Sequence, residues 1–103
     1  MDLIIRVKEI KGNCPVYHPG DCFKLMDGYR LVTEIPLCMH SLSSILPYYN
    51  ALKFCSPDQL GLSSEPDRSR VYVQCLDPCS YTGGGTVIFE ISRSSQPSGG
   101  RSR

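Results

Sequence analysis

The sequence predicts a small α+β domain, with a mostly antiparallel sheet or partial barrel of about five short strands and one kinked helix. Three observations favour this fold class. Several segments alternate between apolar and polar residues, as strands with one wet face do. Asp27-Gly28 is a strong hairpin signal between two apolar runs, and residues 37–53 instead repeat their apolar residues at helical spacing.

The first half of the chain contains three of the expected strands. The segment "LIIRVKEI", residues 3–10, predicts a strand with Ile5, Val7 and Glu9 on one face. A loop dense in Gly, Pro and Asn follows this strand. Residues 22–26 and 29–33 then predict the two strands of a hairpin.

A helix is expected over residues 37–53. Pro36 suits its entrance, whereas Pro47 removes a backbone donor from its interior. We therefore expect a kink at Pro47 or a break into two short helices. Tyr48 and Tyr49 cannot both face the core, so one ring should lie at the surface, as a partner contact or with its hydroxyl in water.

The second half of the chain is expected to return as another hairpin. Residues 55–69 are polar and rich in helix breakers, which indicates a surface loop. Residues 70–77 alternate as a strand, with Val71 and Cys75 on the same face, and residues 86–92 form the last strand.

Length and composition indicate one ordinary globular domain: 103 residues, of which 41% are hydrophobic and 20% charged. We assign the domain to residues 1–93. Residues 94–103 offer no apolar side chains to bury, so we predict that they form a disordered tail.

Charge and hydropathy exclude some classes of function. A net charge of +1 with scattered basic residues argues against nucleic-acid binding, and no stretch is long enough to span a membrane. The start "MDLIIRVKEIKG" lacks the apolar core of a secretion signal, so we expect a cytoplasmic protein. In a reducing cell its six cysteines should be thiols or metal ligands, whereas in a secreted chain they would suggest disulfides.

Cysteine and histidine form three local groups in predicted turns or at the ends of predicted elements. The groups are Cys14, His18 and Cys22; Cys38 and His40; and Cys75 and Cys79, with Cys55 alone. A soft metal needs about four such donors, thiolates and imidazoles for zinc and mainly thiolates for an iron–sulfur cluster. The chain has no C-x-x-C pair, so the fold would have to build such a site from distant segments.

Plain packing is the ordinary alternative, because free cysteine is among the most buried residue types. We expect Cys22 and Cys55 to be structural and His40 to be a surface or partner contact. His18 is either a loop residue or a ligand. Cys38 falls in the first turn of the expected helix, where unpaired amides and the helix dipole favour a thiolate.

The order of motifs resembles a family of small uncharacterised cysteine-containing proteins, found mostly in anaerobic bacteria and archaea. The resemblance covers residues 3–93 and consists of a G-x-C-P-x-x-H-x-x-G-D loop, a Cys before a helix containing P-Y, and a C-x-D-P turn before the final strand. Met39 departs from it, since proline is common there. The resemblance implies an anaerobic cytoplasm but no reaction, and it singles out Cys14, His18, Gly20, Asp21, Cys38, Pro47, Tyr48, Cys75, Asp77 and Pro78.

No catalytic residue is assigned. Gly83-Gly84-Gly85 lacks the Lys-Ser/Thr pair of a phosphate-binding loop and predicts a hairpin tip, while Asp21 and Asp77 are expected to cap turns.

Three hypotheses about function remain. The first is a small zinc- or iron–sulfur-binding module, accessory or electron-transferring, with the donors Cys14, His18, Cys38 and Cys75.

The second hypothesis is a non-catalytic interaction module with buried structural cysteines, which binds a protein partner or a second copy of itself. The third, ranked last, is a thiol redox enzyme that cycles Cys75 and Cys79 or Cys14 and Cys22. Its three-residue spacers are wider than in the usual redox pair.

Overall fold

The fold is a small α+β domain, as the sequence predicts. The computed structural model describes residues 2–94. Its five strands form one open antiparallel sheet in the order β3-β2-β1-β5-β4. The strands are β1 (Leu3–Gly12), β2 (Cys22–Met26), β3 (Arg30–Val32), β4 (Val71–Gln74) and β5 (Gly85–Arg93). The predicted tail, apart from its first residue, lies outside the described residues.

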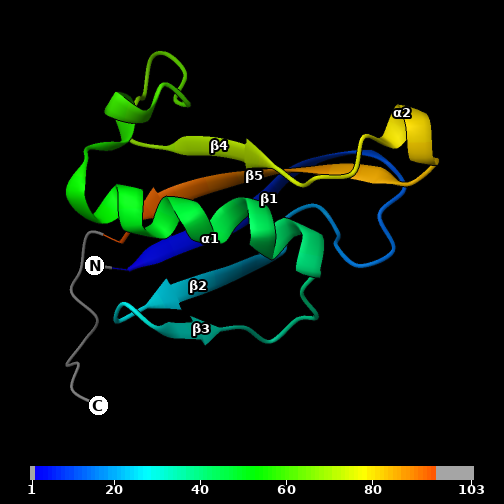
Figure 1. The fold of residues 1–103 in the computed structure, drawn as a ribbon, viewed down its shortest axis with the longest axis horizontal. Coiled ribbons are helices and arrows are strands. Elements are labelled where there is room, and N and C mark those ends of the chain that lie inside the picture. Colours follow the sequence, from blue (N-terminus) through cyan, green and yellow to red (C-terminus); the bar gives the residue numbers. More distant parts are fainter. Residues whose placement is uncertain (1, 95–103) are drawn as a thin grey trace.

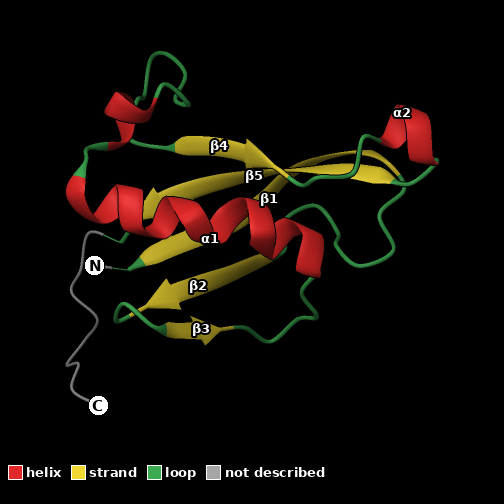
Figure 2. Ribbon diagram, viewed as in Figure 1, coloured by secondary structure: helices red, strands yellow, loops and turns green. Residues whose placement is uncertain are grey.

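One long helix, α1 (Met39–Phe54), runs across one face of the sheet (Figure 1). Two short helical segments, η1 (Pro57–Leu60) and α2 (Cys79–Thr82), lie in the connections on either side of β4 (Figure 2). The expected loop at residues 55–69 therefore contains a turn of 3-10 helix, and the expected turn before β5 contains a short helix.

The two longest strands, β1 and β5, pair at the centre of the sheet. A bulge between Val7 and Glu9 shifts their register, so that Val7 pairs with Phe89 and Glu9 with Ile88. The prediction that Glu9 shares a face with Val7 was therefore wrong. The inserted residue turns Glu9 away from α1 and directs Ile10, paired with the buried Val87, toward it.

The hairpin of β2 and β3 forms where Asp27-Gly28 predicts it. Both residues adopt positive φ, 62° for Asp27 and 89° for Gly28, a conformation that Asp tolerates and Gly adopts freely. This turn sets the register that places Leu25 opposite Leu31.

Helix α1 continues through Pro47 as a single element, so the predicted break into two helices does not occur. Cys38 is its N-cap rather than part of its first turn. The side chains that α1 buries are Ser41, Ile45, Tyr49 and Leu52. They pack against a core from the central strands whose largest fully buried members are Phe89, Leu3, Ile5, Ile91 and Val7.

Of the adjacent tyrosines, Tyr49 is buried, whereas Tyr48 is partly buried and packs against the edge of the core, so neither ring lies fully at the surface. Leu46, one of the apolar residues that repeat at helical spacing in 37–53, is nevertheless 47% exposed. Burial of residues such as Ile45 and Leu52 contributes about 1.5–3 kcal/mol each, which is enough to hold α1 on the sheet despite Pro47.

Candidate thiol pocket

Three cysteines from distant segments line one pocket at the N-terminal end of α1. Cys14 follows β1, Cys38 precedes α1 and Cys75 follows β4. Their pocket has a volume of about 230 Å³, and Tyr17 and Ser41 also line it. We call this cavity the thiol pocket.

The sheet order explains why these segments meet. The order places β5 between β1 and β4, so the residues that follow β1 and β4 both lie against the first half of β5. The backbone N–H of Asn13 donates to the carbonyl of Gly84 at 3.2 Å, and that of Cys75 donates to Val87 at 3.0 Å. Cys14 and Cys75 are thereby held against the same strand.

Close backbone packing fixes the position of Cys14. A Cβ atom at Gly85 would lie 2.7 Å from the backbone nitrogen of Cys14, so only glycine fits there without a shift. At Gly12, φ is 82° and a Cβ atom would lie 2.4 Å from the carbonyl oxygen of Gly84. Both glycines let the Cys14 loop approach β5.

The loop wraps its backbone around the Cys14 sulfur. Cys14 Sγ accepts hydrogen bonds from the backbone N–H groups of Val16, at 3.4 Å, and Tyr17, at 3.3 Å. Amide donors directed at sulfur stabilise negative charge on it, and such bonds tune thiolate ligands of metals. The loop therefore holds the Cys14 sulfur between backbone donors, as the loops around metal-binding cysteines do.

Cys75 is the most deeply buried of the six cysteines, with 7% exposure. Its sulfur accepts a hydrogen bond from the N–H of Val87 at 3.3 Å and donates to the carbonyl of Gly85 at 3.6 Å. Its thiol is thus hydrogen-bonded to the same strand that carries the close contact with Cys14.

Cys38 presents its sulfur at the start of α1. Its backbone is extended, and its side chain makes no capping hydrogen bond to the helix. Its N–H instead donates to the phenolic oxygen of Tyr17 at 3.0 Å, and its carbonyl accepts from Ser41 Oγ at 2.8 Å. Because the backbone alone is used for these contacts, the thiol remains at the helix N-terminus, where the dipole favours negative charge.

Tyr17 connects the parts of the pocket. It is 2% exposed and packs edge-on against Phe89, with the ring centroids 5.4 Å apart and the planes at 84°. Burial raises the pKa of Tyr17 above its ordinary value, and negative charge on Cys38 or Cys14 acts in the same direction. The hydrogen bond with Ser41 partly opposes that shift.

The structure does not place His18 with the three cysteines. Its side chain is 85% exposed, and its backbone N–H donates to the carboxylate of Asp21 at 2.8 Å. The histidine that lines the thiol pocket is His40, which is also exposed, as predicted for a surface residue. Asp77 also lines the pocket, and its carboxylate accepts from Thr82 Oγ1, as expected of a turn cap.

The other three cysteines lie elsewhere. Cys22 begins β2 and pairs with Arg6 on the sheet face away from α1, while Cys55 is the C-cap of α1. Cys79 begins α2, where its N–H donates to Thr86 Oγ1 at 3.3 Å. All six cysteines are free thiols, none of them in a disulfide.

The pocket has the donor types of a soft-metal site, but the side chains are not drawn together as ligands. Within residues 2–94, no group of three or more His, Cys, Asp or Glu side chains is arranged to hold a metal ion. A bound metal would thus require the sulfurs of Cys14 and Cys75 to turn away from their present hydrogen bonds.

Sequence reasoning missed Tyr17 and Ser41. Helical spacing could have identified Ser41. It lies four residues before Ile45, so it falls on the same face of the expected helix, and a hydroxyl buried there needs a hydrogen-bond partner. Nothing comparable identified Tyr17.

Comparison with models of protein families, with curated proteins and with solved structures found no match to this chain. A separate observation concerns membranes: none of the helices in the described part of the chain is long and apolar enough to cross one.

Proposed function

We propose that the protein is a small binding module for zinc or an iron–sulfur cluster, with Cys14, Cys38 and Cys75 as thiolate donors. The observation that carries this proposal is that three segments far apart in sequence each contribute one cysteine to the same pocket. The family resemblance singles out the same three cysteines. It leaves aside Cys22, Cys55 and Cys79, which do not line the pocket.

The chemistry of the pocket supports thiolates there. Cys14 has two backbone donors directed at its sulfur, and Cys38 stands at a helix N-terminus without capping it. Thiolates are the form in which cysteine binds soft metals. When bound, the metal would cross-link β1, α1 and β4 through their ends and so stabilise the fold.

Two histidines are candidates for the fourth donor of the proposed site. His18 belongs to the resemblance, and His40 lines the pocket. The exposed loop position of His18 would require a rearrangement of the Asp21 turn before its imidazole could reach the sulfurs. We therefore favour His40.

Metal content is the direct test. Protein purified without oxygen is expected to contain stoichiometric zinc or iron by elemental analysis, with visible absorption if the metal is an iron–sulfur cluster. The triple variant Cys14→Ser/Cys38→Ser/Cys75→Ser should lose the metal. A matched triple variant, Cys22→Ser/Cys55→Ser/Cys79→Ser, should retain it.

Two single variants identify the fourth donor. We expect His40→Ala to lower metal affinity and His18→Ala to leave it unchanged, with competition against a chelator as the measurement. An absence of zinc and iron after anaerobic purification, together with failure to bind either when added, would reject the metal module.

A non-catalytic interaction module, with the thiols as packing groups, is the competing proposal. The hydrogen bonds of Cys75 with Val87 and Gly85 support it, because they show one of the three thiols already satisfied within the protein. In that case the Cys14/Cys38/Cys75 variant would lose stability alone, and a partner would remain bound in the presence of chelators.

As a metal module, the protein would serve as an accessory or electron-transfer subunit in a reducing, anaerobic cytoplasm. In such a compartment cysteines remain reduced and available as metal ligands.

A further inference from the structure

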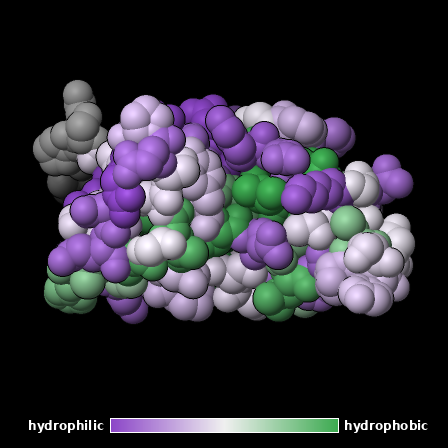
Figure 3. Space-filling view, turned by 90° about the horizontal axis from the view of Figure 1, so that it is seen from above, coloured by the Kyte–Doolittle hydropathy of each residue, from purple (hydrophilic) through white to green (hydrophobic). Residues whose placement is uncertain are grey.

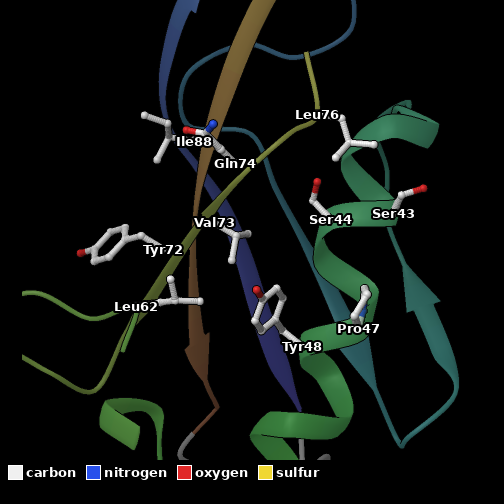
Figure 4. A pocket seen from close by; sticks show the side chains of 10 residues that line it. All are labelled: Ser43, Ser44, Pro47, Tyr48, Leu62, Tyr72, Val73, Gln74, Leu76 and Ile88. Carbon is white, nitrogen blue, oxygen red and sulfur yellow. The ribbon is translucent and has the colours of Figure 1, made fainter. Parts of the chain in front are cut away.

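A second and larger cavity lies between α1 and the edge strand β4, with a volume of about 660 Å³. We call it the β4 groove. Figure 4 shows Tyr48 of α1 and Val73 of β4 facing each other across it, with Leu62 beside them and Leu76 toward one end. In the space-filling view, apolar side chains gather in the middle of this side of the molecule, between more polar ends (Figure 3).

The β4 groove is free of charge. None of the described residues that line it is acidic, basic or a histidine, although 20% of the chain is charged. A charged occupant would lose its hydration there without gaining an ion pair. Charge complementarity therefore favours an uncharged occupant.

The backbone of β4 faces the groove along one edge. Strand β4 is last in the sheet and pairs only with β5. Cys75 N–H donates toward β5, to Val87, whereas Tyr72 N–H donates away from it, to the carbonyl of Leu62 at 2.9 Å. Because such groups alternate along an antiparallel strand, the N–H and C=O of Gln74 also point away from β5.

Two of the devices that protect sheet edges from strand pairing, charged side chains and proline, do not occur in the sequence of this edge. Residues 71–76 include no charged residue and no proline. The opposite edge strand, β3, carries Arg30. The outward-facing backbone of Gln74, the last residue of β4, can thus pair with another strand.

The helix side of the groove supplies further polar groups. Ser44 lines the groove, and its Oγ is buried without a hydrogen-bond partner among residues 2–94. In a regular helix the carbonyl of Ser43 would accept a hydrogen bond from the N–H of residue 47. Proline at this position has no N–H, so the carbonyl lacks that donor. A ligand with amide groups satisfies such positions better than a purely apolar one.

We propose that the β4 groove binds an extended, uncharged peptide segment of a partner protein. The segment adds to the sheet beside Gln74 through backbone hydrogen bonds, and its alternate apolar side chains enter the space between Tyr48 and Val73. This inference is independent of the metal proposal, since the thiol pocket and the β4 groove have no lining residue in common.

The test is a titration of ¹⁵N-labelled full-length protein with the peptide acetyl-Thr-Val-Thr-Leu-Thr-Val-amide. We expect saturable shifts of the Gln74 and Leu76 amides and slowed hydrogen exchange at Gln74. The same peptide with alternate amides N-methylated cannot pair with a strand and should bind at least tenfold more weakly. Absence of saturable binding, or equal binding of both peptides, overturns the proposal.

Two variants locate the site without disturbing the core. Gln74→Pro removes an N–H that points away from β5, a position at which an edge strand tolerates proline. Leu76→Lys adds a charge to a side chain that is 61% exposed. Each should weaken peptide binding at least tenfold, whereas Leu31→Lys on the opposite edge, 44% exposed in the parent protein, should not.

A second copy of the chain is the competing occupant. Sedimentation of the protein alone over a range of concentrations distinguishes it. If the protein self-associates, if Leu76→Lys abolishes that association and if the peptide does not compete with it, the occupant is a second copy and the proposal is overturned. Binding of the peptide to a monomer supports it.

Discussion

The phenolic oxygen of Tyr17 lies 2.7 Å from Ser41 Oγ, in a buried hydrogen bond between the loop after β1 and the first turn of α1. The same phenolic oxygen accepts the N–H of Cys38 at 3.0 Å. Tyr17 also follows Cys14 closely in the loop. One side chain therefore fixes the distance between two of the three cysteine-bearing segments.

Substitution of Tyr17 by Phe should loosen this connection without leaving a large cavity. The ring contact with Phe89 is retained, while the bonds to Ser41 and Cys38 are lost. We expect a loss of about 1–2 kcal/mol in the free energy of unfolding, because the N–H of Cys38 then loses its partner and Ser41 Oγ keeps only its bond to the Cys38 carbonyl. Urea denaturation measures it, with Tyr81→Phe as the control at a tyrosine that is 89% exposed. An equal loss in both variants would contradict the role of the Tyr17 hydroxyl.

The Tyr17 phenol should also make the fold sensitive to alkali. Burial raises the pKa of Tyr17 in the folded protein, so the folded state holds this proton more tightly than the unfolded chain does. The stabilisation is complete below the unfolded pKa, about 10, and is lost as pH rises through the folded pKa.

Alkaline denaturation of the parent protein and of Tyr17→Phe tests this prediction. Above pH of about 10, the stability of the parent should fall more steeply with pH than that of Tyr17→Phe. Parallel curves for the two proteins would show that Tyr17 does not control the alkaline transition.

Addition of one methyl group at Gly85 should displace Cys14. Its Cβ would meet the backbone at Asn13 and Cys14 within 3 Å, and backbone atoms cannot swing aside as a flexible side chain can. We expect Gly85→Ala to cost about 1–3 kcal/mol and to raise the rate at which Cys14 reacts with a thiol reagent. Mass spectrometry of the labelled peptides measures that rate.

Gly20→Ala is the matched control for Gly85→Ala. Gly20 has φ of 91°, so alanine is strained there, but its Cβ would meet nothing within 4 Å. It should lose stability without a change in the reactivity of Cys14. If both variants raise that reactivity equally, general loosening rather than the contact at Gly85 explains the effect.

The sequence predicted local structure well because the relevant signals are local. The alternation in 70–77 and the Asp27-Gly28 pair depend on the preferences of neighbouring residues, and they gave the strands and the turn. Even the choice of Cys14, Cys38 and Cys75 as a set was available, through the order of their motifs.

Pairing between distant segments was not available from the sequence. The bulge after Val7, which reverses the face of Glu9, arises from the register between β1 and β5. Its one mark in the sequence is the polar pair Lys8-Glu9, after which Ile10 falls out of the apolar alternation. Which of His18 and His40 lies at the thiol pocket likewise depends on how the loop after β1 packs against the start of α1. Pro47 predicted a kink or a break, and the break does not occur because burial of Ile45 and Leu52 on either side holds α1 together across the missing hydrogen bond.

Glu90 should stabilise the uncovered face of the sheet. Its side chain is 8% exposed, and its carboxylate lies 4.0 Å from Arg6, 4.0 Å from Lys8 and 3.5 Å from Arg70. The hydroxyl of Tyr72 donates to the same carboxylate at 3.2 Å. One acid thus neutralises several cations that would otherwise repel one another.

Glu90→Gln should therefore lower the free energy of unfolding by about 1–3 kcal/mol. The pKa of Tyr72, raised by burial and then by the hydrogen bond and charge of Glu90, should fall toward its ordinary value. Ultraviolet titration of the tyrosines measures this fall. Glu65→Gln is the control, since Glu65 is 73% exposed and exposed ion pairs contribute little.

Pro47 should reduce the stability of α1 in a way that one substitution can reverse. Alanine at this position restores an N–H for the carbonyl of Ser43 and relieves the clash of the proline ring with the preceding turn. Pro47→Ala is expected to raise the free energy of unfolding by about 1–3 kcal/mol, less than the full propensity difference because the fold already accommodates the ring. Thermal and urea denaturation measure the gain.

Asn50→Ala, at an exposed position of the same helix, is the control for Pro47→Ala. It should raise the free energy of unfolding by only a few tenths of a kcal/mol, because Asn50 already has a backbone N–H and Pro47 does not.

Pro47→Ala also bears on peptide binding in the β4 groove. If peptide binding uses the Ser43 carbonyl, Pro47→Ala should stabilise the protein and weaken binding at once. A loss of stability in Pro47→Ala would instead show that packing of the proline ring in the groove outweighs the missing hydrogen bond.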